Sequence, residues 1–108
     1  MTQVHVQPLA RRDIDDAVDY LVSEADTEVA WRFVDAFTTA LERLSEYPEI
    51  GSPVALSPRM SGVRSWPLVG FESYSLFYHY EMDEVRVLRV LHAARDAANI
   101  LLVEPLDP

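Results

Sequence analysis

The spacing of apolar side chains changes its period along the chain. Residues 3–7 alternate polar and apolar side chains, which predicts a short strand that Pro8 ends. From residue 9 to residue 25 the apolar positions recur at three- and four-residue steps, which predicts an amphipathic helix. The apolar stripe of this helix consists of Ala10, Ile14, Ala17, Val18, Leu21 and Ala25. Three carboxylates are expected in or near its first turns, where they suit the helix dipole: Asp13, Asp15 and Asp16.

A second helix is predicted directly after the first. Asp26-Thr27 offers an N-cap at its start, and Pro48 disfavours helical geometry in the residue before it, so we expect the helix to end near Tyr47. Its apolar face consists of Ala30, Phe33, Val34, Phe37, Ala40, Leu41 and Leu44. The two stripes predict a helical hairpin that covers one face of a sheet.

The second half of the chain reads as strands. Residues 48–61 hold three prolines and a glycine, which favours an irregular connection. Three apolar and aromatic runs follow between residues 62 and 92, with turns near 67–70 and at 82–84, and residues 95–103 have the spacing of a short helix. The order strand, helix, helix, three strands, helix predicts a single α+β domain over residues 1–108.

The net charge and its distribution argue against nucleic-acid binding as the function. Eighteen acids oppose nine bases, every base is arginine, and the formal net charge is −9. Residues 1–58 carry −7, residues 59–95 carry +1 and residues 96–108 carry −3. A nucleic-acid binder normally presents a basic field, so we expect no direct sequence-specific binding of nucleic acid.

The residue types also limit which metal, cofactor and nucleophile sites the chain can hold. The chain has no cysteine, and His5 and His79 have no partner at metal-ligand spacing, so we expect no metal, no cofactor and no cysteine nucleophile. The N-terminus lacks a charged-then-apolar leader, and no apolar run approaches membrane-spanning length. We therefore expect a cytoplasmic protein without a membrane partner.

Arginines inside the strand region are the first candidates for contact with other molecules. Arg64 and Arg89 are expected on adjacent strands, where they could converge on one anion or one acidic partner. The alternative is that each pairs with an acid of the same region as a solvated ion pair, and the residues alone leave both possibilities open. The acids considered for that pairing are Glu72, Glu81, Asp83 and Asp96.

Three further features have a functional and a structural interpretation. His92 could act as a general base, but a structural histidine that hydrogen-bonds through its ring at a strand end is favoured. Arg95-Asp96 could form an exposed recognition corner or could open the last helix, and the second interpretation is favoured. Two-residue alternation places Tyr74, Tyr78 and Tyr80 on one side of a strand, which is typical of a core or a groove wall.

Six segments in order carry a family resemblance. They are Leu9-Ala10 with Asp13-Ile14, Ala17 and Asp19-Tyr20-Leu21; Ala30 and Phe33 with Leu41-Glu42-Arg43-Leu44; Tyr47-Pro48-Glu49-Ile50-Gly51; Gly62-Val63-Arg64; Tyr74-x-Leu76-Phe77-Tyr78; and Val87-Leu88-Arg89-Val90-Leu91-His92 with Arg95-Asp96. Together they cover about residues 4–102, and the chain resembles the ParE toxins of the RelE/ParE superfamily. These proteins are the toxin half of type II toxin–antitoxin modules, including plasmid stabilisation systems.

The resemblance implies one of two activities, because the superfamily divides. RelE-like members cut messenger RNA on the ribosome with clustered basic residues, whereas ParE-like members inhibit DNA gyrase. This chain has no lysine, is acidic, and offers no tyrosine, histidine or arginine after Arg95, so we predict a non-enzymatic gyrase inhibitor with no catalytic residue. A RelE-like endonuclease, a non-toxic module that only binds an antitoxin, and a sheet-edge adaptor unrelated to toxicity stay as alternatives.

The resemblance also implies a ParD-like antitoxin as partner. We expect its disordered segment to fold into the groove between the helical hairpin and the sheet edge, and to be rich in Lys and Arg because residues 1–58 are acidic. Predicted antitoxin-binding residues are Ile14, Val18, Leu21, Phe37, Leu41, Tyr74 and Tyr78. Predicted target-binding residues are Arg64, Arg89, His92, Arg95 and Asp96.

Overall fold

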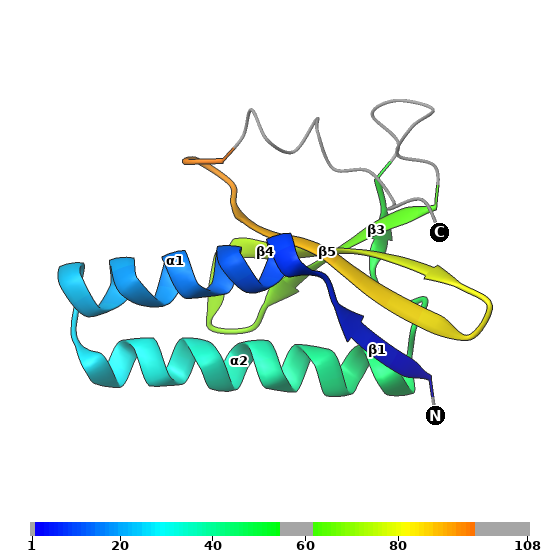
Figure 1. The fold of residues 1–108 in the computed structure, drawn as a ribbon, viewed down its shortest axis with the longest axis horizontal. Coiled ribbons are helices and arrows are strands. Elements are labelled where there is room, and N and C mark those ends of the chain that lie inside the picture. The colour runs from blue at the N-terminus through cyan, green and yellow to red at the C-terminus, as the bar shows by residue number, and fades with distance from the viewer. Residues whose placement is uncertain (1, 55–61, 97–108) are drawn as a thin grey trace.

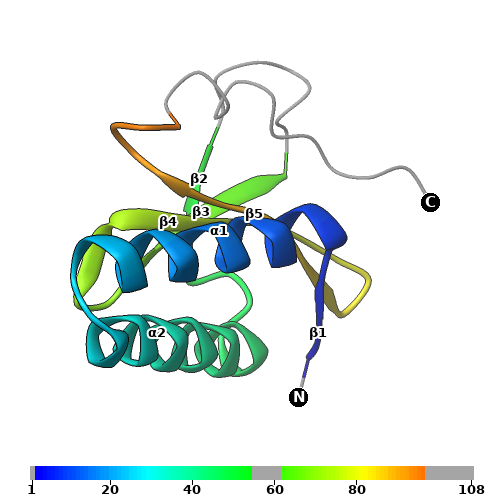
Figure 2. The ribbon, with the colours of Figure 1, turned by 60° about the vertical axis from the view of Figure 1, so that its left-hand side comes forward.

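Two helices lie on one face of a five-stranded sheet (Figures 1 and 2). The computed structural model describes residues 2–54 and 62–96. Its elements are β1 (Gln3–Val6), α1 (Pro8–Glu24), α2 (Thr27–Glu46), β2 (Ser52–Pro53), β3 (Val63–Leu68), β4 (Phe71–Glu81) and β5 (Glu84–His92). The predicted α+β class and helical hairpin are confirmed, whereas the helix predicted over 95–103 falls largely outside the described residues.

The helix ends follow from local chemistry. Pro8 occupies the first turn of α1, where its missing N–H costs nothing. The Asp26 side chain caps α2 by accepting a hydrogen bond of 2.9 Å from the N–H of Val29, and Tyr47 follows the last helical residue, as predicted. The dipole role predicted for the acids of α1 is wrong, because α1 begins at Pro8 and its first turn holds no acidic residue.

The strand order is β1-β5-β4-β3-β2, with β1 parallel to β5 and the other neighbours antiparallel. This order corrects the expectation that Arg64 and Arg89 lie on adjacent strands, because β4 separates β3 from β5. The short edge strand β2 was not predicted, since its two residues include Pro53 and lie in the segment expected to be irregular.

The apolar residues form two clusters. The larger cluster joins both helices to the sheet, with the Phe33 ring meeting Phe71 and Tyr74 edge to face. A smaller cluster contains Val63, Phe77, Leu88 and Leu91. It lies on the opposite side of the sheet, since Phe77 alternates with Leu76 and Tyr78 of the larger cluster. In the described part of the chain, neither helix is long and apolar enough to span a membrane.

Candidate functional site

Asp13 on α1 binds the edge of β5. The Nε of Arg89 lies 2.8 Å from Oδ2 of Asp13, and Nη2 lies 2.9 Å from Oδ1. Oδ2 also accepts a hydrogen bond of 2.9 Å from the backbone N–H of Val90. β1 pairs with β5 only as far as Val87, so Asp13 supplies an acceptor where the parallel strand has ended. The hydrogen bonds that Arg89 donates to the Asp13 carboxylate raise the pKa of the Arg89 guanidinium.

Arg64 lies on β3, on the other side of β4 from Arg89, and binds backbone carbonyls. Its Nη1 donates to the carbonyls of Glu49 and Gly51 at 3.1 and 2.8 Å. The Tyr78 hydroxyl donates to the carbonyl of Pro48 at 2.8 Å and accepts from the N–H of Gly51 at 2.9 Å. These bonds hold the loop after α2 against the sheet, and burial raises the pKa of Tyr78.

The two arginines therefore do not converge on one anion. Arg89 pairs with Asp13, and Arg64 binds backbone carbonyls, so within the described residues neither arginine pairs with the four acids named above. The actual acceptors lie in α1 and in the loop after α2. The charges of the strand region alone therefore do not reveal the acceptors of Arg64 and Arg89.

A compact corner follows β5. The ring Nδ1 of His92 accepts hydrogen bonds of 3.2 Å from the N–H groups of Ala94 and Arg95, and Asp96 accepts one of 2.8 Å from the N–H of His92. The favoured structural interpretation of His92 is confirmed. The Asp96 carboxylate turns back to the strand end, and the helix that it was expected to open lies outside the described residues.

Arg95 fixes this corner to α1 and β4. Its guanidinium carbon lies 4.3 Å from the centre of the Tyr20 ring, and Nη2 donates to the Tyr74 hydroxyl at 2.7 Å. Burial raises the pKa of Tyr74, against the opposing charge of Arg95. Arg95, Asp96 and Asp13 line a cavity of about 140 Å³. Four of the five predicted target-binding residues therefore lie around one region, and Arg64 lies apart from it.

The predicted antitoxin-binding residues pack within the chain itself. Ile14, Val18, Leu21, Phe37 and Leu41 are partly buried against the core, and Tyr74 and Tyr78 are buried in it. Their contacts with a partner stay a prediction. A hollow of about 360 Å³ does lie between α2 and β3, at the predicted groove. It is lined by Ala36, Thr39, Ala40, Arg43, Trp66 and Val69, which the sequence analysis did not select.

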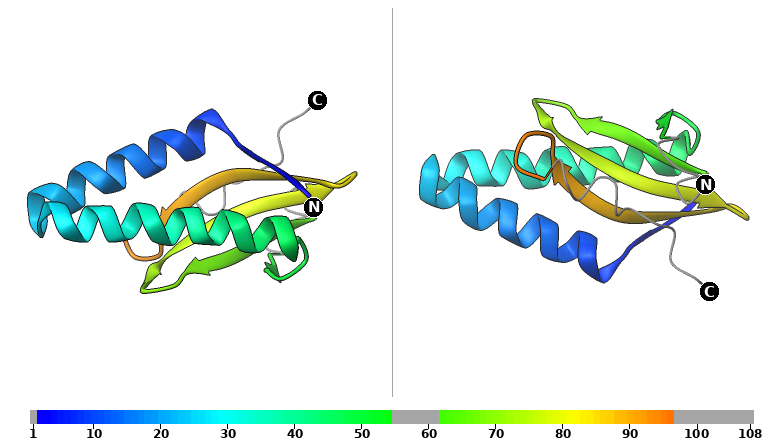
Figure 3. Two further views of the ribbon diagram at one scale, coloured as in Figure 1. Left: turned by 90° about the horizontal axis from the view of Figure 1, so that it is seen from below. Right: turned by 90° about the horizontal axis from the view of Figure 1, so that it is seen from above.

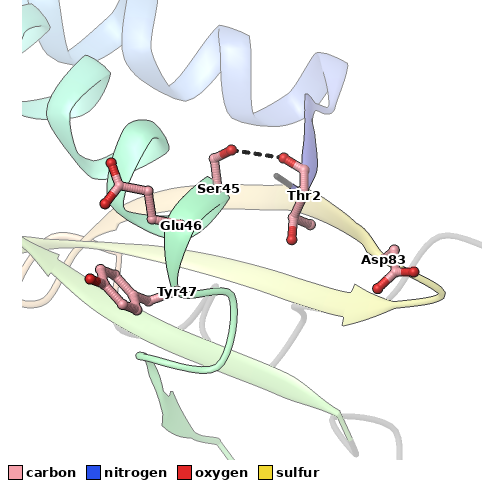
Figure 4. A pocket seen from close by; sticks show the side chains of 5 residues that line it. All are labelled: Thr2, Ser45, Glu46, Tyr47 and Asp83. Atoms are coloured by element: carbon pink, nitrogen blue, oxygen red, sulfur yellow. Dashed lines mark hydrogen bonds between the residues drawn. The ribbon is translucent and has the colours of Figure 1, made fainter.

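A second hollow, of about 620 Å³, lies between the end of α2, the start of β1 and the β4–β5 turn (Figure 4). Its lining residues are Thr2, Ser45, Glu46, Tyr47 and Asp83. The Ser45 hydroxyl donates to the carbonyl of Thr2 at 2.8 Å, which ties the first strand to α2. Among the described residues, this lining contains no histidine, lysine or arginine to activate a ribose hydroxyl or to bind a phosphate.

Comparisons with known proteins give one matching family model and two structures of similar fold. The family model described as "ParE toxin of type II toxin-antitoxin system, parDE" matches residues 4–97. A structure of the chromosomal ParDE system from P. aeruginosa is similar at a TM-score of 0.71 and 22% identity, over 85% of this chain and 96% of that chain. The toxin–antitoxin complex RelBE2 from Mycobacterium tuberculosis is similar at a TM-score of 0.57 and 23% identity, over 84% and 90%. No curated protein sequence matches the chain.

Proposed function

This chain belongs to the ParE toxin family of type II toxin–antitoxin systems, and on that basis we propose its target and its partner. It acts as a protein inhibitor of DNA gyrase rather than as an enzyme, and a ParD-like antitoxin neutralises it. The resemblance of the sequence to the gyrase-inhibiting branch of the superfamily supports the target. The likeness to a ParDE structure supports the fold alone, because identity to it is low.

The observation that carries the proposal is the state of the basic residues. Cleavage of RNA needs a group to take the 2′-hydroxyl proton and cations to stabilise the phosphate. On the described sheet and corner, Arg64, Arg89 and Arg95 each donate to acceptors of the chain itself. The Nδ1 of His92 already accepts two backbone N–H groups. These contacts occupy the basic groups that RNA cleavage would need, which favours inhibition by binding over RNA cleavage.

The hollow between α2 and β3 supports binding of an antitoxin segment. Trp66 from β3 and Val69 from the β3–β4 turn face Ala36 and Ala40 of α2 across it, and Val69 is 69% exposed. An extended or helical segment with apolar side chains would bury these groups and gain hydrophobic free energy. The net charge of −9 favours a segment rich in Lys and Arg.

Induced expression in a bacterial host separates the two activities. A gyrase inhibitor that traps cleaved DNA elicits the DNA-damage response and leaves messenger RNA intact. We expect that result, and we expect co-expression of the antitoxin to suppress it. Codon-specific cuts in ribosome-bound messenger RNA, without a DNA-damage response, would contradict the proposal and would point to the RelE-like alternative.

A further inference from the structure

The helical hairpin carries a second row of side chains beside its core face, and this row is mostly apolar. On α2 this row contains Thr27, Trp31 and Val34, at steps of four and three residues. Trp31 is 65% exposed, although α2 places other large apolar side chains in the core. Val18 and Val22 of α1 lie opposite, and Val22 is 47% exposed.

These side chains enclose a cavity of about 260 Å³ between the helices. We call it the Trp31 notch, and it is lined by Val18, Val22, Thr27, Ala30, Trp31 and Val34. Among the described residues of this lining, Thr27 adds a hydroxyl and Trp31 an indole N–H, and the other side chains are apolar. Figure 3 shows that α1 and α2 meet at their turn and diverge toward β1.

Acidic side chains border the notch on both helices. On α2, Glu28, Asp35 and Glu42 are spaced by seven residues and all are exposed. Residues seven apart in a helix differ in direction by only about 20°, so Glu28 and Asp35 lie on one side of Trp31, and Glu42 continues this stripe about two turns beyond Val34. On α1, Asp15 and Asp19 are exposed close to Val18. A ligand that matches an apolar recess with acidic side chains on both sides carries apolar side chains at its centre and basic side chains next to them.

We propose that the Trp31 notch binds a basic amphipathic helix of the antitoxin, an inference that rests on the proposed function. Apolar residues of this helix at three- and four-residue steps pack between Trp31 and Val22, as in a three-helix bundle. Its Lys or Arg side chains pair with Asp35 and Asp19 at the borders. An exposed tryptophan at the centre of an apolar recess is typical of a binding hot spot.

A second copy of this chain does not fit the notch. A symmetric contact would bring the same carboxylates together, on a molecule whose net charge is already −9. The hollow near Trp66 lies on the opposite side of α2, since the mean direction of its residues Ala36, Thr39, Ala40 and Arg43 is about half a turn from the mean direction of the notch residues on α2. One antitoxin chain that fills both sites therefore contacts α2 from two sides.

The test measures affinity between the purified chain and the antitoxin encoded beside it. Trp31→Ala removes the proposed anchor, and we expect it to raise Kd about tenfold or more. Asp35→Lys reverses one border charge, and we expect a rise of about threefold to tenfold at low salt that shrinks at high salt. Glu81→Lys is the matched control, because Glu81 is exposed beside the β4–β5 turn at the other end of the molecule. It should leave Kd within about twofold of the parent.

Fluorescence gives a direct readout of the notch. The chain has two tryptophans, so Trp66→Phe leaves Trp31 as the single reporter. We expect its emission to shift to shorter wavelength and its quenching by acrylamide to fall when the antitoxin binds. Thermal melts of each variant, matched to the parent, establish that the folds are comparable.

Three results would overturn the inference. The first is an unchanged Kd in both variants, with Trp31 still quenched in the complex. The second is self-association of the parent chain that Trp31→Ala abolishes, which would give the notch to a second copy. The third is loss of toxicity in Trp31→Ala with full antitoxin affinity, which would give it to the target. A chain that binds the antitoxin through the notch but leaves gyrase active overturns the proposed target and not the notch.

Discussion

Asp13 and Arg89 lie 76 positions apart in the chain and share two hydrogen bonds of 2.8 and 2.9 Å. The pair joins the second turn of α1 to β5, and its side chains are only 14% and 21% exposed. Asp13 also accepts from the N–H of Val90. This carboxylate therefore positions the first helix on the sheet, and Arg89 holds the carboxylate.

Arg89→Ala should lower the free energy of unfolding by about 1.5–3 kcal/mol, because it leaves a largely buried carboxylate without its charged donor. Urea unfolding of Arg89→Ala, Asp13→Ala and the double variant measures this effect. The double variant should lose less than the sum of the single losses. Arg86→Ala is the control, since Arg86 lies 4.0 Å from Glu84 at the surface and should cost about 0.5 kcal/mol or less. Strictly additive losses would contradict the pairing.

Tyr78→Phe should lower the free energy of unfolding by about 1–3 kcal/mol, because the N–H of Gly51 and the carbonyl of Pro48 lose their partner. Tyr80→Phe is the matched control on the same strand. The Tyr80 hydroxyl makes only a long contact of 3.4 Å with Asp83, so its loss should change stability by about 0.5 kcal/mol or less. Equal losses in the two variants would contradict the role assigned to the Tyr78 hydroxyl.

Stability should fall at alkaline pH through Tyr78. Burial raises its pKa in the folded chain, so the folded state holds the phenolic proton more tightly than the unfolded state. The stability from this group is therefore fully present below the unfolded pKa of about 10 and is lost as pH rises through the folded value. Urea unfolding from pH 8 to pH 11 should show a decline that is shallower in Tyr78→Phe. Parallel declines would count against the assignment.

Arg95 tests the corner after β5 as a target contact. Arg95 is an exposed residue whose guanidinium lies over Tyr20 and donates to Tyr74, so Arg95→Ala should cost about 1 kcal/mol of stability. We expect this variant to lose toxicity while it keeps its affinity for the antitoxin. Growth arrest on induced expression measures toxicity, with Arg86→Ala as the control. Full toxicity in Arg95→Ala would remove the corner from the target surface.

Local features made the helices predictable, whereas the site depends on distant contacts. The cap at Asp26 and the stop before Pro48 are encoded within a few residues, so the bounds of α2 follow from the sequence. The partner of Arg89 is not encoded near it, because Asp13 comes from a helix in the other half of the chain. The strand order could not be predicted either, because no local feature of the sequence indicates that β4 lies between the strands of Arg64 and Arg89.

The Trp31 notch could be predicted from the sequence only in part. The seven-residue spacing of Glu28, Asp35 and Glu42 is visible in the sequence. Only the packing of α2 against α1 shows that an apolar recess lies next to the exposed side chains of Glu28 and Asp35. Trp31 is not part of the apolar face predicted for α2, and the packing of the helices places it at the edge of the recess.

The most direct test of the account is a supercoiling assay with purified DNA gyrase and relaxed plasmid. We predict that the chain blocks supercoiling and leaves cleaved plasmid after denaturation of the enzyme, and that prior addition of the antitoxin restores activity. A parallel translation reaction should retain intact messenger RNA. Full gyrase activity at a large molar excess of the folded chain, together with cleaved messenger RNA in the translation reaction, would contradict the account.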